Sequence, residues 1–185
     1  GASVLYSNAT DAQDVGNSSG YVTSFDSDGF TTQGASSNNN VNEDTKDFVV
    51  WNWKAGGATT ADNSAGAGNT PTAGSVKVNG SNYGSSLAGS TPLIRGSANT
   101  EAGMSMVTYV GNGGSSNNWA HLLSQAPELI ITKNRDSGSF SWATAWQATT
   151  DQSTVYLNTN VASFSGSNQW NSTVPNATVV AVGAS

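Results

Sequence analysis

The stretch YVTSFDSDGFTT, residues 21–32, places two short runs of β-prone residues on either side of a turn. Side chains alternate between two faces along residues 21–25, which is the period of a strand. Residues 26–29 have the Asp-Ser-Asp-Gly composition of a turn, and residues 30–32 open another strand. The stretch therefore predicts a strand, a turn and a second strand.

The strongest strand prediction falls on FVVWNW, residues 48–53, which is almost entirely β-branched or aromatic. One face would carry Phe48, Val50 and Asn52, and the other would carry Val49, Trp51 and Trp53. Further strands are predicted at residues 4–6, 75–78, 92–94, 104–110, 129–133, 140–147, 154–157 and 178–182. No segment keeps a helical period, and only residues 119–125 suggest a helical turn. Many short strands with polar turns predict an all-β fold of the sandwich class.

Residues 58–102 differ from the rest of the chain. They are rich in Gly, Ala, Ser and Thr, and Tyr83 is their one aromatic residue. A structureless loop of this length is unusual inside a compact domain. We therefore expect a linker or a surface excursion in which some residues pair, between a first part at residues 1–57 and a third part at residues 103–185.

Charge and composition narrow the classes of partner. The net charge is -6, and the six Lys and Arg residues are scattered along 185 residues. Phosphate binding needs clustered cations, so we expect no nucleic-acid partner. No stretch approaches the roughly 20 apolar residues of a membrane helix, so no membrane insertion is expected. The chain has no cysteine, which excludes disulfides and thiolate metal sites.

The residues that could carry chemistry are few. His121 is the single histidine, and we expect it to be structural because no nucleophile motif accompanies it. Asp26 and Asp28 begin like a calcium loop, but the twelfth position is Ser37 rather than Glu. We therefore expect no enzymatic activity, no catalytic residue and no cofactor. Calcium bridging by these acids, or by the acidic stretch at 42–47, stays as an alternative to plain solvated turns.

The six tryptophans raise the question of sugar stacking. Trp51 and Trp53 share a strand face and are expected in a core or a subunit interface. Trp119 and Trp170 lie in Asn- and Ser-rich sequence, so they are the candidates for exposed glycan stacking.

Several strings resemble a repeat family found in tail-fibre and virion proteins of marine, cyanophage-like bacteriophages. The strings are GMSMVTYVGNG (103–113), AHLLSQAPELIITKNRD (120–136), VYLNTN (155–160), NQWNSTVPNATVVAVGAS (168–185), SFDSDGFTTQGASSNNNVNED (24–44) and FVVWNWKAGG (48–57). The resemblance implies an antiparallel β-sandwich of the concanavalin/laminin-G kind. A jelly roll stays as the alternative within the all-β class. In the family's order, residues 1–57 match the second half of a repeat and residues 103–185 match its first part. Either the chain is cut from a tandem array, or residues 1–57 complete the sandwich, in cis or in a neighbouring subunit.

The function implied by the resemblance is structural. We expect a virion-surface protein, such as a tail fibre or a capsid or tail decoration subunit, that acts in assembly and in host attachment. The expected partners are further copies of the chain in a homo-oligomer or filament, other virion proteins and a host-surface glycan. The alternatives are a lectin-like carbohydrate-binding module and a subunit of a bacterial extracellular filament or adhesin. The residues expected to pair strands during assembly are Phe48, Val49, Val50, Trp51 and Trp53.

Overall fold

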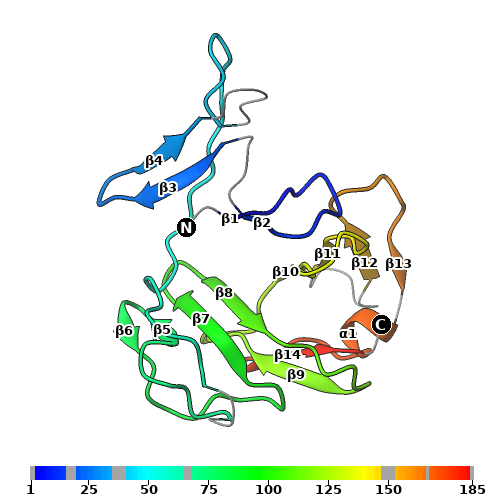
Figure 1. Cartoon of the computed structure of the whole chain (residues 1–185). Helices are drawn as coiled ribbons and strands as arrows, with labels where there is room; N and C mark the ends of the chain where they lie inside the picture. The colour runs from blue at the N-terminus through cyan, green and yellow to red at the C-terminus, as the bar shows by residue number, and fades with distance from the viewer. Residues whose placement is uncertain are drawn as a thin grey trace. The chain divides into compact units, whose positions relative to one another are not determined.

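The computed structural model describes residues 3–15, 20–34, 41–64, 68–146, 153–165 and 167–183 (Figure 1). Its elements are β1 (Ser3–Val4), β2 (Asp14–Val15), β3 (Tyr21–Phe25), β4 (Phe30–Gln33), β5 (Val76–Val78), β6 (Ser81–Asn82), β7 (Leu93–Asn99), β8 (Met104–Tyr109), β9 (Asn117–Ala120), β10 (Leu129–Thr132), β11 (Ala143–Trp146), β12 (Ser153–Tyr156), β13 (Phe164–Ser165), α1 (Ser167–Trp170) and β14 (Val179–Val182). No helix in the described ranges is long and apolar enough to cross a membrane.

The strands form several small sheets. Two sheets have four strands, in the orders β6-β5-β7-β8 and β10-β11-β12-β13, and the pairs β1-β2, β3-β4 and β14-β9 form two-stranded sheets. Most pairs are antiparallel, while β5 and β7 run parallel. The predicted all-β class is confirmed, and the sheets are consistent with a β-sandwich type of fold.

The chain divides into two compact units, which are described separately. Unit 1 comprises Gly1–Trp51, Thr132–Ala143 and Tyr156–Val161, and unit 2 comprises Asn52–Ile131, Thr144–Val155 and Ala162–Ser185. The boundaries do not follow the predicted division at residues 57 and 102. Each unit takes stretches that lie far apart in the sequence.

In unit 1, the predicted strand, turn and second strand are confirmed at residues 21–33. Strands β3 and β4 pair antiparallel, with Tyr21 opposite Gln33 and a bulge between Val22 and Ser24. The turn is closed by a hydrogen bond from the backbone N–H of Asp26 to the carbonyl of Gly29 at 2.9 Å. The hydroxyl of Thr31 donates to the Asp26 carboxylate at 3.1 Å. Through these two bonds, Asp26 stabilises the turn.

In unit 2, residues 58–102 supply much of the core, so the prediction that they form a linker or a surface excursion is wrong. Strands β5, β6 and β7 all lie in this stretch. Val76 and Leu93 are fully buried, and Leu87 and Ala98 are buried with them. Tyr83 is the one aromatic residue of the stretch, and its buried core positions are filled instead by aliphatic and small side chains that allow close packing.

A buried asparagine ties the start of this stretch to β7. The Asn63 side-chain amide donates to the carbonyl of Leu93 at 3.1 Å, and its oxygen accepts from the backbone N–H of Thr72 at 2.9 Å. Its own backbone N–H donates to the carbonyl of Ile94 at 2.9 Å. Buried polar groups must be hydrogen-bonded. In this irregular stretch, the hydrogen bonds of Asn63 take the place of the bonds that a paired strand would make.

The predicted helical turn at residues 119–125 is wrong. Residues 117–120 form strand β9, which pairs antiparallel with β14 and places Trp119 opposite Val180. Leu122, two residues after the end of β9, has a φ of 65°, which a right-handed helix cannot contain. The partner strand β14 decides the conformation here, rather than the local composition.

Candidate functional site

Residues 48–53 are the most unusual surface feature of the chain. They are assigned to no strand, so the prediction of a strand within this chain is wrong. Phe48, Val49, Val50, Trp51 and Trp53 are all exposed, Val49 at 82% and Trp51 at 74%. Elsewhere in the described ranges, exposed large hydrophobic residues do not directly follow one another. High β propensity alone therefore does not make a strand, because packing against neighbouring strands decides the outcome.

Two glycines that follow this segment, Gly56 and Gly57, are held inside unit 2. The carbonyl of Gly56 accepts from the backbone N–H of Gly80 at 2.9 Å. The carbonyl of Gly57 accepts from the Ser97 hydroxyl at 2.7 Å. A Cβ on Gly56 would lie 2.7 Å from both the backbone nitrogen of Ala98 and the carbonyl oxygen of Lys77. Only glycine fits this position, so the backbone at Gly56 packs closely against β5 and β7.

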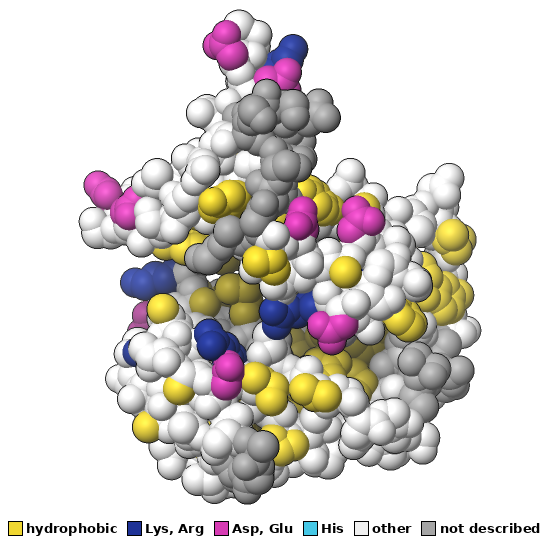
Figure 2. Space-filling model, viewed as in Figure 1, with side chains coloured by type: hydrophobic (Ala, Val, Ile, Leu, Met, Phe, Trp, Pro, Cys, Tyr) yellow, Lys and Arg dark blue, Asp and Glu magenta, His cyan; other side chains and the backbone are white. Residues whose placement is uncertain are grey.

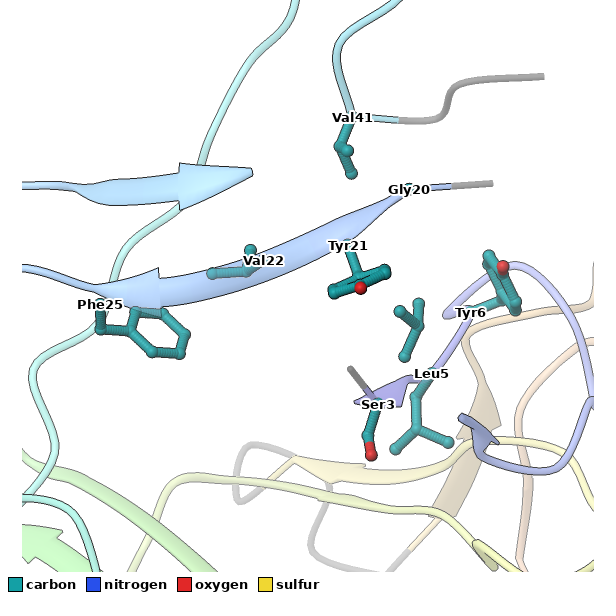
Figure 3. A pocket seen from close by; sticks show the side chains of 9 residues that line it. Ser3, Leu5, Tyr6, Gly20, Tyr21, Val22, Phe25 and Val41 are labelled. Atoms are coloured by element: carbon teal, nitrogen blue, oxygen red, sulfur yellow. The ribbon is translucent and has the colours of Figure 1, made fainter. Parts of the chain in front are cut away.

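A pocket of about 300 Å³ lies in unit 1 (Figure 3). Most of its lining is apolar, and Tyr6, Tyr21 and Phe25 supply aromatic rings. Two of its polar groups are engaged inside the protein: the Tyr21 hydroxyl donates to Gln33 at 3.1 Å, and the Ser3 hydroxyl accepts from Gln13 at 3.1 Å. The pocket therefore suits an apolar group better than a sugar, whose hydroxyls need free polar partners.

The two tryptophans proposed for glycan stacking are buried, so the prediction that they are exposed is wrong. Trp119 is 5% exposed and Trp170 is 3% exposed. The Trp119 ring meets Tyr109 edge-on, with ring centroids 5.3 Å apart. The indole N–H of Trp170 donates to the Thr154 hydroxyl at 3.0 Å. Polar neighbours in the sequence suggested a loop, but each tryptophan packs its own element into unit 2.

His121 is buried, and both of its ring nitrogens meet the backbone. Nδ1 accepts from the backbone N–H of Leu123 at 3.1 Å, and Nε2 lies 3.0 Å from the carbonyl of Asn176. Because Nδ1 accepts, the neutral ring carries its proton on Nε2 and donates it to Asn176. Burial lowers the pKa of His121, and the bond to the Asn176 carbonyl opposes this shift only in part. This geometry holds two backbone segments together.

We expect the free energy of unfolding to fall as the pH drops below about 6.5, the ordinary pKa of histidine in an unfolded chain. In the window between the lowered folded pKa and this value, the unfolded state takes up a proton that the native state refuses. The slope is at most about 1.4 kcal/mol per pH unit, with stability rising toward higher pH. Urea unfolding at several pH values between 7.5 and 5.5 measures it.

The control for this pH dependence is His121→Asn, whose side-chain oxygen can still accept from Leu123 but does not titrate. The variant should lose the slope above pH 5.5, since His121 is the chain's single histidine. Equal slopes in both proteins would show that His121 is not the group responsible.

No metal site is found among the described residues, where no group of three or more His, Asp or Glu side chains could hold an ion. The Asp26 carboxylate accepts from Thr31 instead. Figure 2 shows that charged side chains are sparse and scattered on the face in view, with hydrophobic ones between them. On the face in view, exposed hydrophobic side chains therefore offer apolar contact.

Among known protein families, one family model matches the chain. The family model described as "Domain of unknown function (DUF7483)" matches residues 1–185. No curated protein and no solved structure matches the chain.

Proposed function

The chain belongs to the DUF7483 family, whose function is unknown, and on the basis of its own residues we propose that it is a non-enzymatic structural subunit that associates with copies of itself. We further propose that it works at a virion surface, as a tail-fibre or decoration subunit acting in assembly and host attachment. The association is supported by the surface of the chain, and the virion setting is supported by the resemblance of its sequence strings to phage repeats.

The observation that carries the proposal is the exposed run at residues 48–53. A contiguous apolar surface marks an interaction site, because water contact with such a surface is unfavourable. Five of the six side chains are large and apolar, and all five are exposed. The run combines high β propensity with no charge and no proline, which is the composition of segments that pair with other strands.

The sequence left two alternative functions, a bacterial filament subunit and a lectin-like module, and the structure bears on them differently. A subunit of a bacterial extracellular filament would use the same exposed run, so electron microscopy of the native particle distinguishes it from a virion protein. A lectin-like module has lost its main support, because the tryptophans on which it depended are buried. We therefore keep self-association as the proposed activity in either setting.

Replacing Val50 by aspartate should weaken self-association by about thirtyfold or more, because a charge at the centre of an apolar contact costs about 2 kcal/mol or more. The wild-type chain should form oligomers or filaments at micromolar concentration, and Val50→Asp should shift them to monomer. Sedimentation velocity over a concentration series, with electron microscopy of the same samples, measures this.

The matched control is Val174→Asp, since Val174 is exposed to 53% and Val50 to 54%. It adds the same charge to an equally exposed valine in unit 2, so its association should equal that of the wild type. Self-association is contradicted if the wild-type chain stays monomeric at every concentration, or if both variants associate like the wild type.

A further inference from the structure

We propose that the open edge of strand β8 accepts residues 48–53 of a second copy of the chain, which adds a fifth strand to the sheet β6-β5-β7-β8. This inference rests on the proposed self-association and names the surface that receives the exposed run.

Strand β8 lies at one end of its sheet and pairs only with β7 among the described strands. It spans six residues, whereas β6 at the other end of the sheet spans two. An edge strand presents a row of backbone N–H and C=O groups to any extended chain that approaches it. Natural proteins blunt such edges with Lys, Pro or very short strands, and Met104–Tyr109 has none of these features.

Both faces of β8 suit an apolar partner strand. On one face, Tyr109 packs edge-on against the buried Trp119. On the other face, Met106 is 58% exposed, and it is followed by the exposed Val110. Side chains alternate along a strand, so an added strand at this edge needs apolar residues on both of its faces.

Residues 48–53 meet this requirement. Phe48 and Val50 would lie on one face of the added strand, and Val49, Trp51 and Trp53 on the other. The donor and the acceptor are each six residues long, roughly 20 Å as strands. Cross-strand apolar and aromatic pairs then add to the backbone hydrogen bonds.

The donor and acceptor surfaces differ, so the contact is heterologous, and each added copy brings a further β8 edge and a further exposed run at residues 48–53. Such a contact builds a filament unless the rotation between copies closes a ring. Residues 48–53 are assigned to no strand of their own chain. A second copy is therefore the occupant that we assign to the edge.

Disulfide trapping tests this contact, because the chain has no cysteine of its own. Val49→Cys and Val50→Cys are each mixed with Met106→Cys and Val107→Cys, so that both faces of the added strand are sampled. After mild oxidation, mass spectrometry identifies the joined peptides. Directly opposed residues on antiparallel strands have Cα atoms about 4.5–5.5 Å apart, within the range that a disulfide spans. We expect at least one mixed pair to cross-link about tenfold more than Val50→Cys with the control Val174→Cys.

Three results would overturn the inference. The first is cross-linking of Val50→Cys to Tyr21→Cys instead, which would make the pocket of unit 1 the acceptor. The second is a monomeric disulfide within a Val50→Cys, Met106→Cys double variant, which would mean pairing inside one chain. The third is association that Val50→Asp abolishes but that yields no cross-link to β8; in that case self-association stands and only the named acceptor fails.

Discussion

Replacing Gly56 by alanine is expected to destabilise the protein by about 3 kcal/mol or more, at the upper end of the cost of overpacking. The added methyl group would lie 2.7 Å from the backbone nitrogen of Ala98 and from the carbonyl oxygen of Lys77. Real Cβ atoms do not approach other atoms this closely, and both neighbours are backbone atoms of paired strands. Relief of the clash would require moving β5 and β7 apart or detaching the Gly56 carbonyl from Gly80.

The matched control for this prediction is Gly84→Ala, because a Cβ at Gly84 would meet nothing within 4 Å. Its stability should equal or exceed that of the wild type by up to about 1 kcal/mol, through lower entropy of the unfolded chain. Urea unfolding followed by circular dichroism, at one fixed protein concentration, measures both variants. A Gly56→Ala variant as stable as Gly84→Ala would show that Gly56 does not pack closely against β5 and β7.

Replacing Trp170 by alanine is expected to lower the free energy of unfolding by about 3–5 kcal/mol, the usual cost of emptying a buried tryptophan site. The indole is 3% exposed, and its N–H is hydrogen-bonded to Thr154, whose side chain is fully buried. The variant therefore creates a cavity and also leaves a buried hydroxyl without that partner. A residue placed on the surface to stack on a sugar would not show this loss.

Two further variants separate the parts of this effect. Trp170→Phe keeps most of the ring and removes the donor, so its loss should be smaller, about 1–3 kcal/mol. Trp146→Ala removes a tryptophan that is 64% exposed and should cost less than about 1 kcal/mol. If Trp170→Ala were no more destabilising than Trp146→Ala, the buried position of Trp170 would be contradicted.

Local pattern was enough to predict the class of the fold and the position of many strands. Residues 21–25 alternate clearly and form β3, and residues 104–109 and 129–132 form strands where apolar β-prone runs predicted them. In each of these cases the local propensity and the tertiary partner agree. The hairpin was the clearest, because Asp26 and Gly29 close its turn within the same short stretch.

β propensity failed to predict strands where pairing with a distant strand decides the conformation. Residues 48–53 have a stronger β pattern than residues 117–120, yet only the latter form a strand, because β14 lies beside them. Residues 58–102 were misjudged because their core consists of small and aliphatic side chains, with Asn63 supplying hydrogen bonds that no hydropathy pattern reveals.

For the candidate site, the sequence singled out residues 48–53 but did not predict that they lie outside any strand and are exposed. It predicted them as a pairing strand, and their exposure follows only from the arrangement of the other strands. The sequence did not single out the edge of β8, which we propose as the acceptor, because a strand's place at the end of a sheet depends on pairings between distant segments. The absence of charge and proline from residues 104–109 was the one available signal.

The discontinuous make-up of unit 1 bears on how the protein is made. Its first stretch ends at Trp51 and its next begins at Thr132, so a ribosome adding residues one by one reaches the second stretch only after unit 2 has begun to emerge. At a synthesis rate of about 5–20 residues per second, the interval is roughly 4–16 s. Throughout that time the nascent chain exposes the apolar run at 48–53, and unit 1 cannot complete its fold. Newly made chains should therefore depend on chaperones, or on low local concentration, to avoid joining before they have folded.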